Sequence, residues 1–141
     1  MIVRRDLPRT RAADFSDCEK YRYCLRYCFD GSVLDPPKRP VVFCMCNPST
    51  ADELEPDPTV RRCMGYAQTW GHSDLIVVNV YALRSTDPDE LLRAADPIGP
   101  ANDSVLATLP RDAPIVCAWG NHKAVRPRAA RVVELLNRNL Y

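Results

Sequence analysis

The chain has 141 residues, of which 19 are Lys or Arg and 18 are Asp or Glu, so its formal net charge is +1. This length suits a single domain with a substantial core, and the balanced charge gives no global field that would attract a nucleic acid or a membrane surface. No apolar stretch approaches the ~20 residues that span a bilayer, and residues 1–11 lack the apolar centre of a signal peptide. We therefore expect a cytoplasmic protein without a membrane partner.

The amino-terminal part is predicted to form an arm followed by a strand. Residues 1–16 are rich in charge and are expected to be a basic, loosely held arm ahead of one α/β domain at 17–141. From Cys18 to Phe29, Tyr and Leu alternate with charged residues and Cys, and this period of two predicts a half-exposed strand or hairpin arm. The turn at 30–32 and the proline-rich stretch 35–40 predict an extended linker into the first buried strand.

The middle of the chain is predicted to form a parallel α/β unit. The apolar run 41–46 predicts a buried strand, residues 60–70 place apolar side chains on one face of a helix, and 75–81 predict a second buried strand. Asp57 or Thr59 is expected to cap the helix, because a side-chain oxygen satisfies its free N–H groups. A strand, a helix and a strand in this order imply a right-handed crossover and a parallel pair.

The last part of the chain is predicted to complete the sheet. Short helices are expected at 91–95 and 101–109, a third buried strand at 115–119, and a covering helix at 128–137. This order predicts a three-layer α/β/α sandwich with a mostly parallel central sheet and an amino-terminal antiparallel strand or hairpin at its edge. Because the chain stops just after the last helix, we expect a domain that is either minimal or lacks a carboxyl-terminal strand and loop.

The turn after the first buried strand carries the main candidate site. Apolar strands that stop at polar turns are where open α/β sheets build their sites. The Asn47 amide can hold a water molecule or bind the edge of a base, because it offers one acceptor and two donors. Pro48 fixes the backbone, and Ser49 and Thr50 add hydroxyl and N–H groups that suit a phosphate. The alternative is a turn in which these groups only stabilise their own loop.

The other two strand ends carry further candidates. Asn79 interrupts an apolar strand, where an amide without hydrogen-bond partners costs on the order of 1–3 kcal/mol, so its partner is either the protein or a ligand. The third strand ends in Trp119-Gly120-Asn121-His122, in which the glycine permits close backbone approach. His122 suits a general acid or base because imidazole titrates near neutral pH. The alternative is an ordinary surface histidine.

Arg84 lies near the same strand ends with several other cations. Together they predict a locally basic rim, which suits phosphate. Solvated helix faces explain the same charges equally well. The other cations are Arg61, Arg62, Lys123, Arg126 and Arg128.

The cysteines and glycines give no sign of a bound cofactor. None of the seven cysteines belongs to the paired Cys-x-x-Cys pattern of structural zinc sites. Cys44, Cys46 and Cys117 lie in apolar runs and are predicted to be small buried hydrophobes. The sequence contains neither a Gly-x-x-x-x-Gly-Lys phosphate loop nor a Gly-x-Gly-x-x-Gly motif. We expect no metal and no cofactor.

Over about residues 17–137 the chain resembles a bacterial and phage family of domains of unknown function. Several separate motifs of that family occur here in order, which makes the resemblance specific. It implies membership of the family without implying an activity. The motifs are NPSTAD at 47–52, DPTVRRC at 57–63, VNVYALR at 78–84, AADPIGPAND at 94–103 and AWGNH at 118–122.

A more distant resemblance is to the uracil-DNA glycosylase superfamily, which has a Gly-x-Asp/Asn-Pro motif after its first strand, an Asn at a later strand end and a subsequent Leu-Trp-Gly. Here Asn47-Pro48 is similar to the first motif, Asn79 to the second and Trp119-Gly120 to the third. The resemblance implies that a base is flipped into the crevice, that Asn79 reads its Watson–Crick edge and that Asn47 holds the attacking water.

Two departures from that superfamily bear on catalysis. Cys46 stands where the first motif usually has a small residue, and the superfamily's final His-Pro loop has no counterpart before Tyr141. Two hypotheses therefore remain in which the crevice binds a ligand or partner. The first is a protein that recognises a nucleobase, nucleotide or nucleic acid and acts as a glycosylase-like N-glycosidic hydrolase. The second is a non-catalytic module that binds DNA, a nucleotide or a partner protein, and the missing loop favours it.

The first hypothesis assigns roles to the strand-end residues. Asn47 and His122 would be catalytic. The predicted substrate-binding residues are Pro48, Ser49, Thr50, Asn79, Arg84, Trp119, Gly120 and Asn121.

A third hypothesis is a small structural or interaction protein. In such a protein the crevice would be filled by its own side chains.

Overall fold

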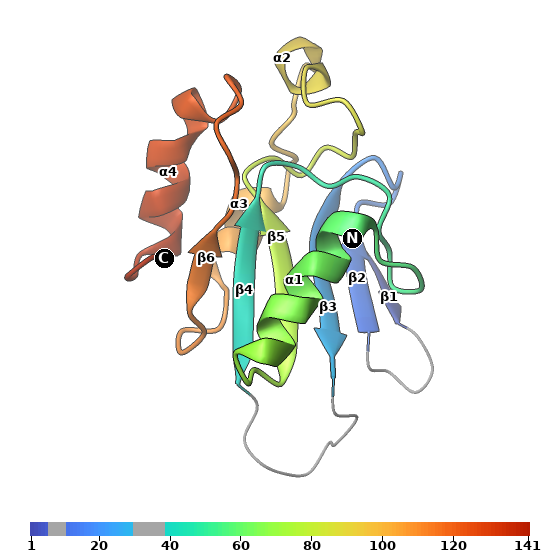
Figure 1. Ribbon diagram of the computed structural model, residues 1–141. Helices are drawn as coiled ribbons and strands as arrows, with labels where there is room; N and C mark the ends of the chain where they lie inside the picture. Colours follow the sequence, from blue (N-terminus) through green and yellow to red (C-terminus); the bar gives the residue numbers. More distant parts are fainter. Residues whose placement is uncertain (6–10, 30–38) are drawn as a thin grey trace.

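A computed structural model describes residues 1–5, 11–29 and 39–141. The predicted turn at 30–32 and most of the linker at 35–40 lie outside the described residues. The described part forms six strands and four helices (Figure 1). They are β1 (Ile2–Arg5), β2 (Arg11–Phe15), β3 (Arg22–Cys28), β4 (Pro40–Met45), α1 (Pro58–Thr69), β5 (Asp74–Asn79), α2 (Glu90–Arg93), α3 (Asn102–Ala107), β6 (Ile115–Cys117) and α4 (Arg126–Leu136).

All six strands belong to one mixed sheet with the order β1-β2-β3-β5-β4-β6. β4 pairs in parallel with β5 and β6, whereas the β1–β2, β2–β3 and β3–β5 pairings are antiparallel. The prediction of a mostly parallel sheet is therefore wrong, while the α/β class and the antiparallel amino-terminal edge are confirmed. The stretches between β1, β2 and β3 are shorter than the dozen or more residues that a parallel crossover needs.

The segment predicted to be a loose arm contributes two strands to this sheet. β1 and β2 pair over four positions, from Ile2 opposite Phe15 to Arg5 opposite Ala12. Phe15 is fully buried, and the guanidinium carbons of Arg4 and Arg84 lie 4.9 and 4.8 Å from the centre of its ring. The charged residues do not prevent a strand, because alternate side chains of β2 point into the core and the others face outward.

Hydrophobic clusters lie on both faces of the sheet. β5 is buried at every position, as expected for a strand covered on both sides. One cluster joins alternate residues of β4 and β5 to the buried face of α1, and the other joins the intervening residues to α3 and α4. The first includes Val41, Phe43, Leu75, Val77, Val60, Cys63 and Ala67, and the second includes Val42, Cys44, Ile76, Val78, Leu106, Val132 and Leu136. Figure 1 shows α1 in front of the sheet.

Helix α1 begins at a cap that the sequence predicts. The Asp57 carboxylate accepts a hydrogen bond from the Val60 N–H at 2.9 Å, so Asp57 is the cap. The helix starts at Pro58, earlier than predicted, because proline tolerates a first-turn position. Gly71, at φ +81°, follows its end. Trp70 is the last apolar residue of the helix predicted at 60–70, but it is 52% exposed instead of lying on the buried face.

The later elements follow the predicted order. The two short helices, the third strand and the last helix appear as α2, α3, β6 and α4. Leu140 continues beyond α4 to form a parallel bridge with Ile115 of β6. Within the described residues, none of the helices has the length and apolar character needed to cross a membrane.

Candidate functional site

The carboxyl ends of β4, β5 and β6 meet at one edge of the sheet, because these strands run parallel. A pocket of about 70 Å³ lies at the ends of β4 and β5, next to the first turn of α1 and to β3. This volume holds about two water molecules at ~30 Å³ each. The lining residues are Arg22, Met45, Asn47, Pro48, Ser49, Asp57, Thr59, Val60 and Asn79.

Asn47 connects the loops that follow β4 and β5 through hydrogen bonds. Its side-chain nitrogen donates hydrogen bonds to the carbonyl oxygens of Ser85, at 2.9 Å, and Pro48, at 3.1 Å. The Ser85 N–H in turn donates to the Pro48 carbonyl at 2.9 Å. The amide nitrogen of Asn47 is thus used by the fold, and the group that remains for a ligand is its side-chain oxygen.

Replacing Asn47 by alanine is therefore expected to destabilise the protein. The loss of the bonds to Ser85 and Pro48 should lower the free energy of unfolding by about 1–2 kcal/mol. Urea unfolding measures this change as a lower midpoint at unchanged slope. Thr50→Ala is the control, because Thr50 is exposed in the same turn and should change stability by less than ~0.5 kcal/mol. Equal midpoints for the two variants would contradict this connecting role of Asn47.

Asn79 places an unused donor at the pocket. It is the last residue of β5, is 1% exposed, and its side-chain nitrogen has no hydrogen-bond partner among the described residues. A buried donor without a partner costs about 1–3 kcal/mol. The sequence left either the protein or a ligand as the partner of Asn79. The described part of the protein does not supply a partner for this nitrogen, which leaves it available for a ligand.

Arg22 is a pocket residue that the sequence pattern does not predict. Its side chain is 2% exposed, Nη1 donates to the Ala51 carbonyl at 2.8 Å, and Nε has no partner among the described residues. Burial lowers its pKa to about 10, while the Asp57 carboxylate acts in the opposite direction. The guanidinium therefore stays charged at neutral pH.

A β-bulge explains why the alternating pattern misplaced Arg22. The register between β2 and β3 shifts between Asp14 and Phe15, where the opposite residue changes from Cys24 to Arg22. An extra residue in one strand re-aims the following side chains to the other face of a sheet. A strict period of two assigns Arg22 to the polar face of the strand, whereas the bulge turns it into the pocket.

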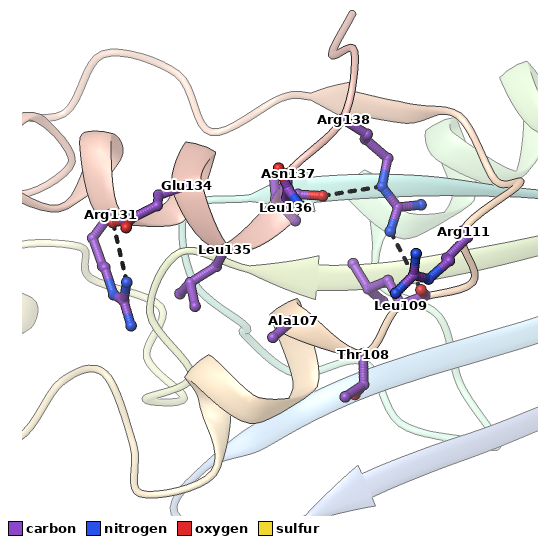
Figure 2. Close-up of a pocket in the computed structure, with 10 residues that line it drawn as sticks. All are labelled: Ala107, Thr108, Leu109, Arg111, Arg131, Glu134, Leu135, Leu136, Asn137 and Arg138. Atoms are coloured by element: carbon purple, nitrogen blue, oxygen red, sulfur yellow. Dashed lines mark hydrogen bonds and ion pairs between the residues drawn. The ribbon is translucent and has the colours of Figure 1, made fainter.

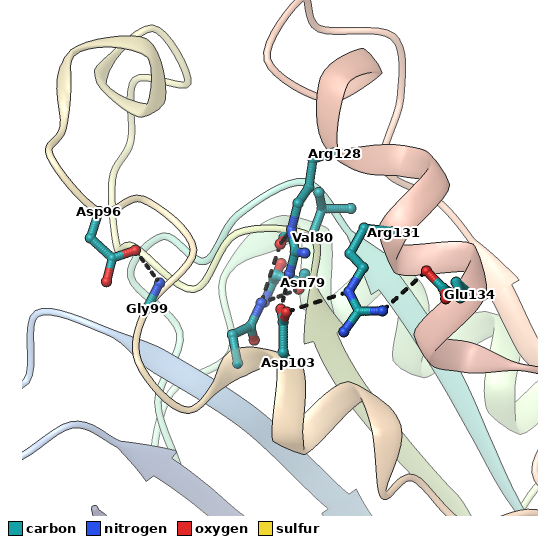
Figure 3. Close-up of polar contacts among 9 residues, drawn as sticks. Asn79, Val80, Asp96, Gly99, Asp103, Arg128, Arg131 and Glu134 are labelled. Carbon is teal, nitrogen blue, oxygen red and sulfur yellow. Dashed lines mark hydrogen bonds and ion pairs between the residues drawn. The ribbon is translucent and has the colours of Figure 1, made fainter.

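Two side chains, those of Asn102 and Arg128, hold the backbone at the end of β5, and Figure 3 shows Arg128 beside Val80 and Asp103. The Asn102 side-chain nitrogen donates to the carbonyls of Asn79, at 3.0 Å, and Val80, at 3.2 Å. Arg128 Nε donates to the same Val80 carbonyl at 3.3 Å, and its guanidinium forms an ion pair with Asp103. Arg128 was predicted for the basic rim, but it is 6% exposed and supports the fold instead.

His122 joins two loops at the same end of the sheet. Its Nε2 lies 2.8 Å from Asp89 Oδ1, and its Nδ1 accepts the Ala124 N–H at 3.2 Å. The hydrogen bond from His122 lowers the pKa of Asp89. Both ring nitrogens are thus engaged within the protein, and His122 is absent from the lining of the pocket that contains Asn47.

The remaining predicted residues also lie outside the pocket lining. Thr50, Gly120 and Asn121 are exposed. Arg84 stacks on the aromatic ring of β2 described above. Trp119 is half-buried and packs against the cluster of the α3 and α4 face. Of the predicted site residues, the pocket brings together Asn47, Pro48, Ser49 and Asn79.

A larger hollow of about 790 Å³ lies beside the end of α4 and the segment after α3 (Figure 2). Arg131 donates to Glu134 at 3.0 Å. Arg138 donates to the carbonyls of Leu136, at 3.1 Å, and Leu109, at 3.3 Å. These two cations are committed to protein acceptors, so this hollow is a weaker candidate than the strand-end pocket.

The thiols provide neither an evident metal site nor a strong nucleophile at the strand ends. Among the described residues, no group of three or more His, Cys, Asp or Glu side chains could hold a metal. Cys44 is buried as predicted, and Cys46 and Cys117 are half-buried. Burial raises the pKa of Cys46, which keeps this thiol protonated and unreactive.

The fold and the pocket define an α/β protein with a small polar pocket at the carboxyl ends of parallel strands. Residues 22–141 match the family described as "Protein of unknown function (DUF1643)", and the chain belongs to this family. No curated protein and no solved structure matched the chain.

Proposed function

We propose that this protein binds a nucleotide or nucleic acid through the pocket at the ends of β4 and β5. One observation carries this proposal: two residues that line the pocket, Asn79 and Arg22, each have a buried side-chain donor, Nδ2 and Nε, without a partner among the described residues. A ligand with acceptor oxygens satisfies both donors. Nucleotides carry such oxygens on their bases and their phosphates.

The arrangement favours binding without catalysis over the hydrolase hypothesis. Both ring nitrogens of His122 are engaged with Asp89 and Ala124. The Asn47 nitrogen is engaged with main-chain carbonyls, and His122 does not line the pocket. The two residues predicted to be catalytic therefore do not converge on one point.

A specific observation keeps glycosylase-like hydrolysis as the second candidate. Asn47 and Asn79 line the same pocket, which is the pairing that the resemblance to the uracil-DNA glycosylase superfamily implies. In this alternative the Asn47 oxygen orients a water molecule toward the glycosidic carbon, and Asn79 donates to the base. A three-layer arrangement of that superfamily's kind belongs to this proposal as well.

Replacing Asn79 by leucine tests the binding proposal. Leucine keeps the shape of the side chain and removes its donor, so affinity for uridine monophosphate or a short oligonucleotide should fall at least about tenfold. Stability should be retained, because the lost Nδ2 donor has no partner among the described residues. Isothermal titration gives the affinity and urea unfolding gives the stability. Wild-type protein that binds no nucleotide and no oligonucleotide would refute the proposal.

The same samples distinguish the two candidates. Base release is measured on single- and double-stranded oligonucleotides that carry uracil or other altered bases. Binding without release supports the non-catalytic module. Release that disappears in Asn47→Ala, while Thr50→Ala keeps it, supports the hydrolase.

A further inference from the structure

The two unpartnered donors of the pocket come from adjacent strands, because β3 pairs with β5. Arg22 is 2% exposed and Asn79 is 1% exposed, so water satisfies neither donor from the bulk. No carboxylate of the described residues lies within ion-pair distance of Arg22. A buried charge without a partner is costly, and a ligand that pairs with it recovers that cost.

The charges around the pocket favour a negative ligand group close to Arg22. The Asp57 carboxylate lines the same pocket and opposes an anion, but it is occupied by the Val60 N–H as a helix cap. The Arg84 guanidinium lies near enough to lower the pKa of Arg22, so it contributes a second positive charge. The first turn of α1 adds the positive end of the helix dipole.

The volume of the pocket limits which part of a nucleotide can enter it. A space of about 70 Å³ takes a compact group the size of about two water molecules. A phosphate or a carboxylate is that compact, whereas a whole base with its sugar is larger. The Ser49 and Thr59 side chains border the same space and carry hydroxyl groups.

We propose that the pocket binds the anionic oxygen group of its ligand, a phosphate or a carboxylate, through Arg22 Nε and Asn79 Nδ2. Ser49 and the first turn of α1 supply further donors, as at other helix N-termini that hold anions. The inference rests on the proposed function in that the phosphate of a nucleotide is such a group. The base then lies outside the pocket, which differs from the flipped base implied by the glycosylase resemblance.

Four probes test this assignment by isothermal titration on the full chain: inorganic phosphate, acetate, uridine and uridine monophosphate. Phosphate and uridine monophosphate are expected to bind, with uridine at least about tenfold weaker than its monophosphate. Arg22→Met should weaken phosphate binding at least about tenfold. Arg93→Met, which removes an exposed charge from helix α2 outside the pocket lining, should change it by less than about twofold.

A second variant, Arg22→Lys, distinguishes a loss of phosphate binding from a failure to fold. Arg22→Lys keeps the positive charge but loses the fork of donors, so it should bind phosphate more weakly than wild type and more tightly than Arg22→Met. In the wild type, phosphate should raise the unfolding temperature, and it should do so less in Arg22→Lys.

The outcomes separate the inference from the proposed function. Uridine that binds as tightly as its monophosphate would overturn the inference and leave nucleotide binding intact. Binding of phosphate or acetate without binding of any nucleotide or oligonucleotide would support the anion pocket and refute the proposed function. Equal phosphate affinities of wild type and folded Arg22→Met would overturn the assignment to Arg22.

Discussion

Replacing Phe15 by alanine is expected to lower the free energy of unfolding by about 3–5 kcal/mol. Phe15 is fully buried in β2, and two guanidinium groups stack on its ring, so the change removes both packing and cation–π contacts. The expected result is a large drop in the urea midpoint. The result matters because β1 and β2 precede residues 22–141, the region that matches the family.

Val3→Ala is the matched control for this change. Val3 lies in β1 of the same hairpin and is 49% exposed, so its truncation should cost less than ~0.5 kcal/mol. If Phe15→Ala were as mild as Val3→Ala, residues 1–16 would behave as the loose arm that their charge predicted. A large difference would make this hairpin an integral part of the domain.

The second large effect is expected in helix α4. Arg128→Ala removes the hydrogen bond to the Val80 carbonyl and the ion pair with Asp103, and should cost about 2–4 kcal/mol. Arg131 lies one turn further along α4, pairs with the same Asp103 and with Glu134, and is 52% exposed. Arg131→Ala should therefore cost less than ~1 kcal/mol.

Urea unfolding of the two α4 variants compares a buried and an exposed arginine that share one acid. Because Arg128 holds the backbone next to Asn79, Arg128→Ala should also raise amide hydrogen exchange at the end of β5. Equal stability losses for the two variants would contradict the supporting role of Arg128. Unchanged exchange at residues 79–80 would contradict its link to the pocket.

The local patterns of the central part predicted its elements well. The strands predicted at 41–46 and 75–81 occur as β4 (Pro40–Met45) and β5 (Asp74–Asn79), and Asp57 caps the helix between them. These predictions succeed because strands buried on both faces and a capped amphipathic helix are set by nearby residues. The parallel pairing of β4 with β5 follows from the crossover that the helix imposes.

The amino-terminal strands were harder to predict because charge obscured a short alternation. In β2 only Ala13 and Phe15 are buried, which is too brief a pattern to outweigh the surrounding arginines. The pairing of β3 with β5 is a contact between distant parts of the chain, and it makes most strand pairings antiparallel. No local property of the β3 sequence indicates which strand β3 pairs with.

For the candidate site too, some residues were predictable from the sequence and others only from the tertiary structure. The sequence by itself determined that Asn47, Pro48 and Ser49 follow a buried strand, because the apolar run 41–46 stops there, and that Asn79 is a polar residue within a second apolar run. Only the tertiary structure decided that Arg22 joins them and that His122 binds Asp89 instead. A β-bulge between β2 and β3 turns Arg22 inward, and loop packing fixes His122. Both depend on contacts between segments far apart in the chain, which local periodicity does not encode.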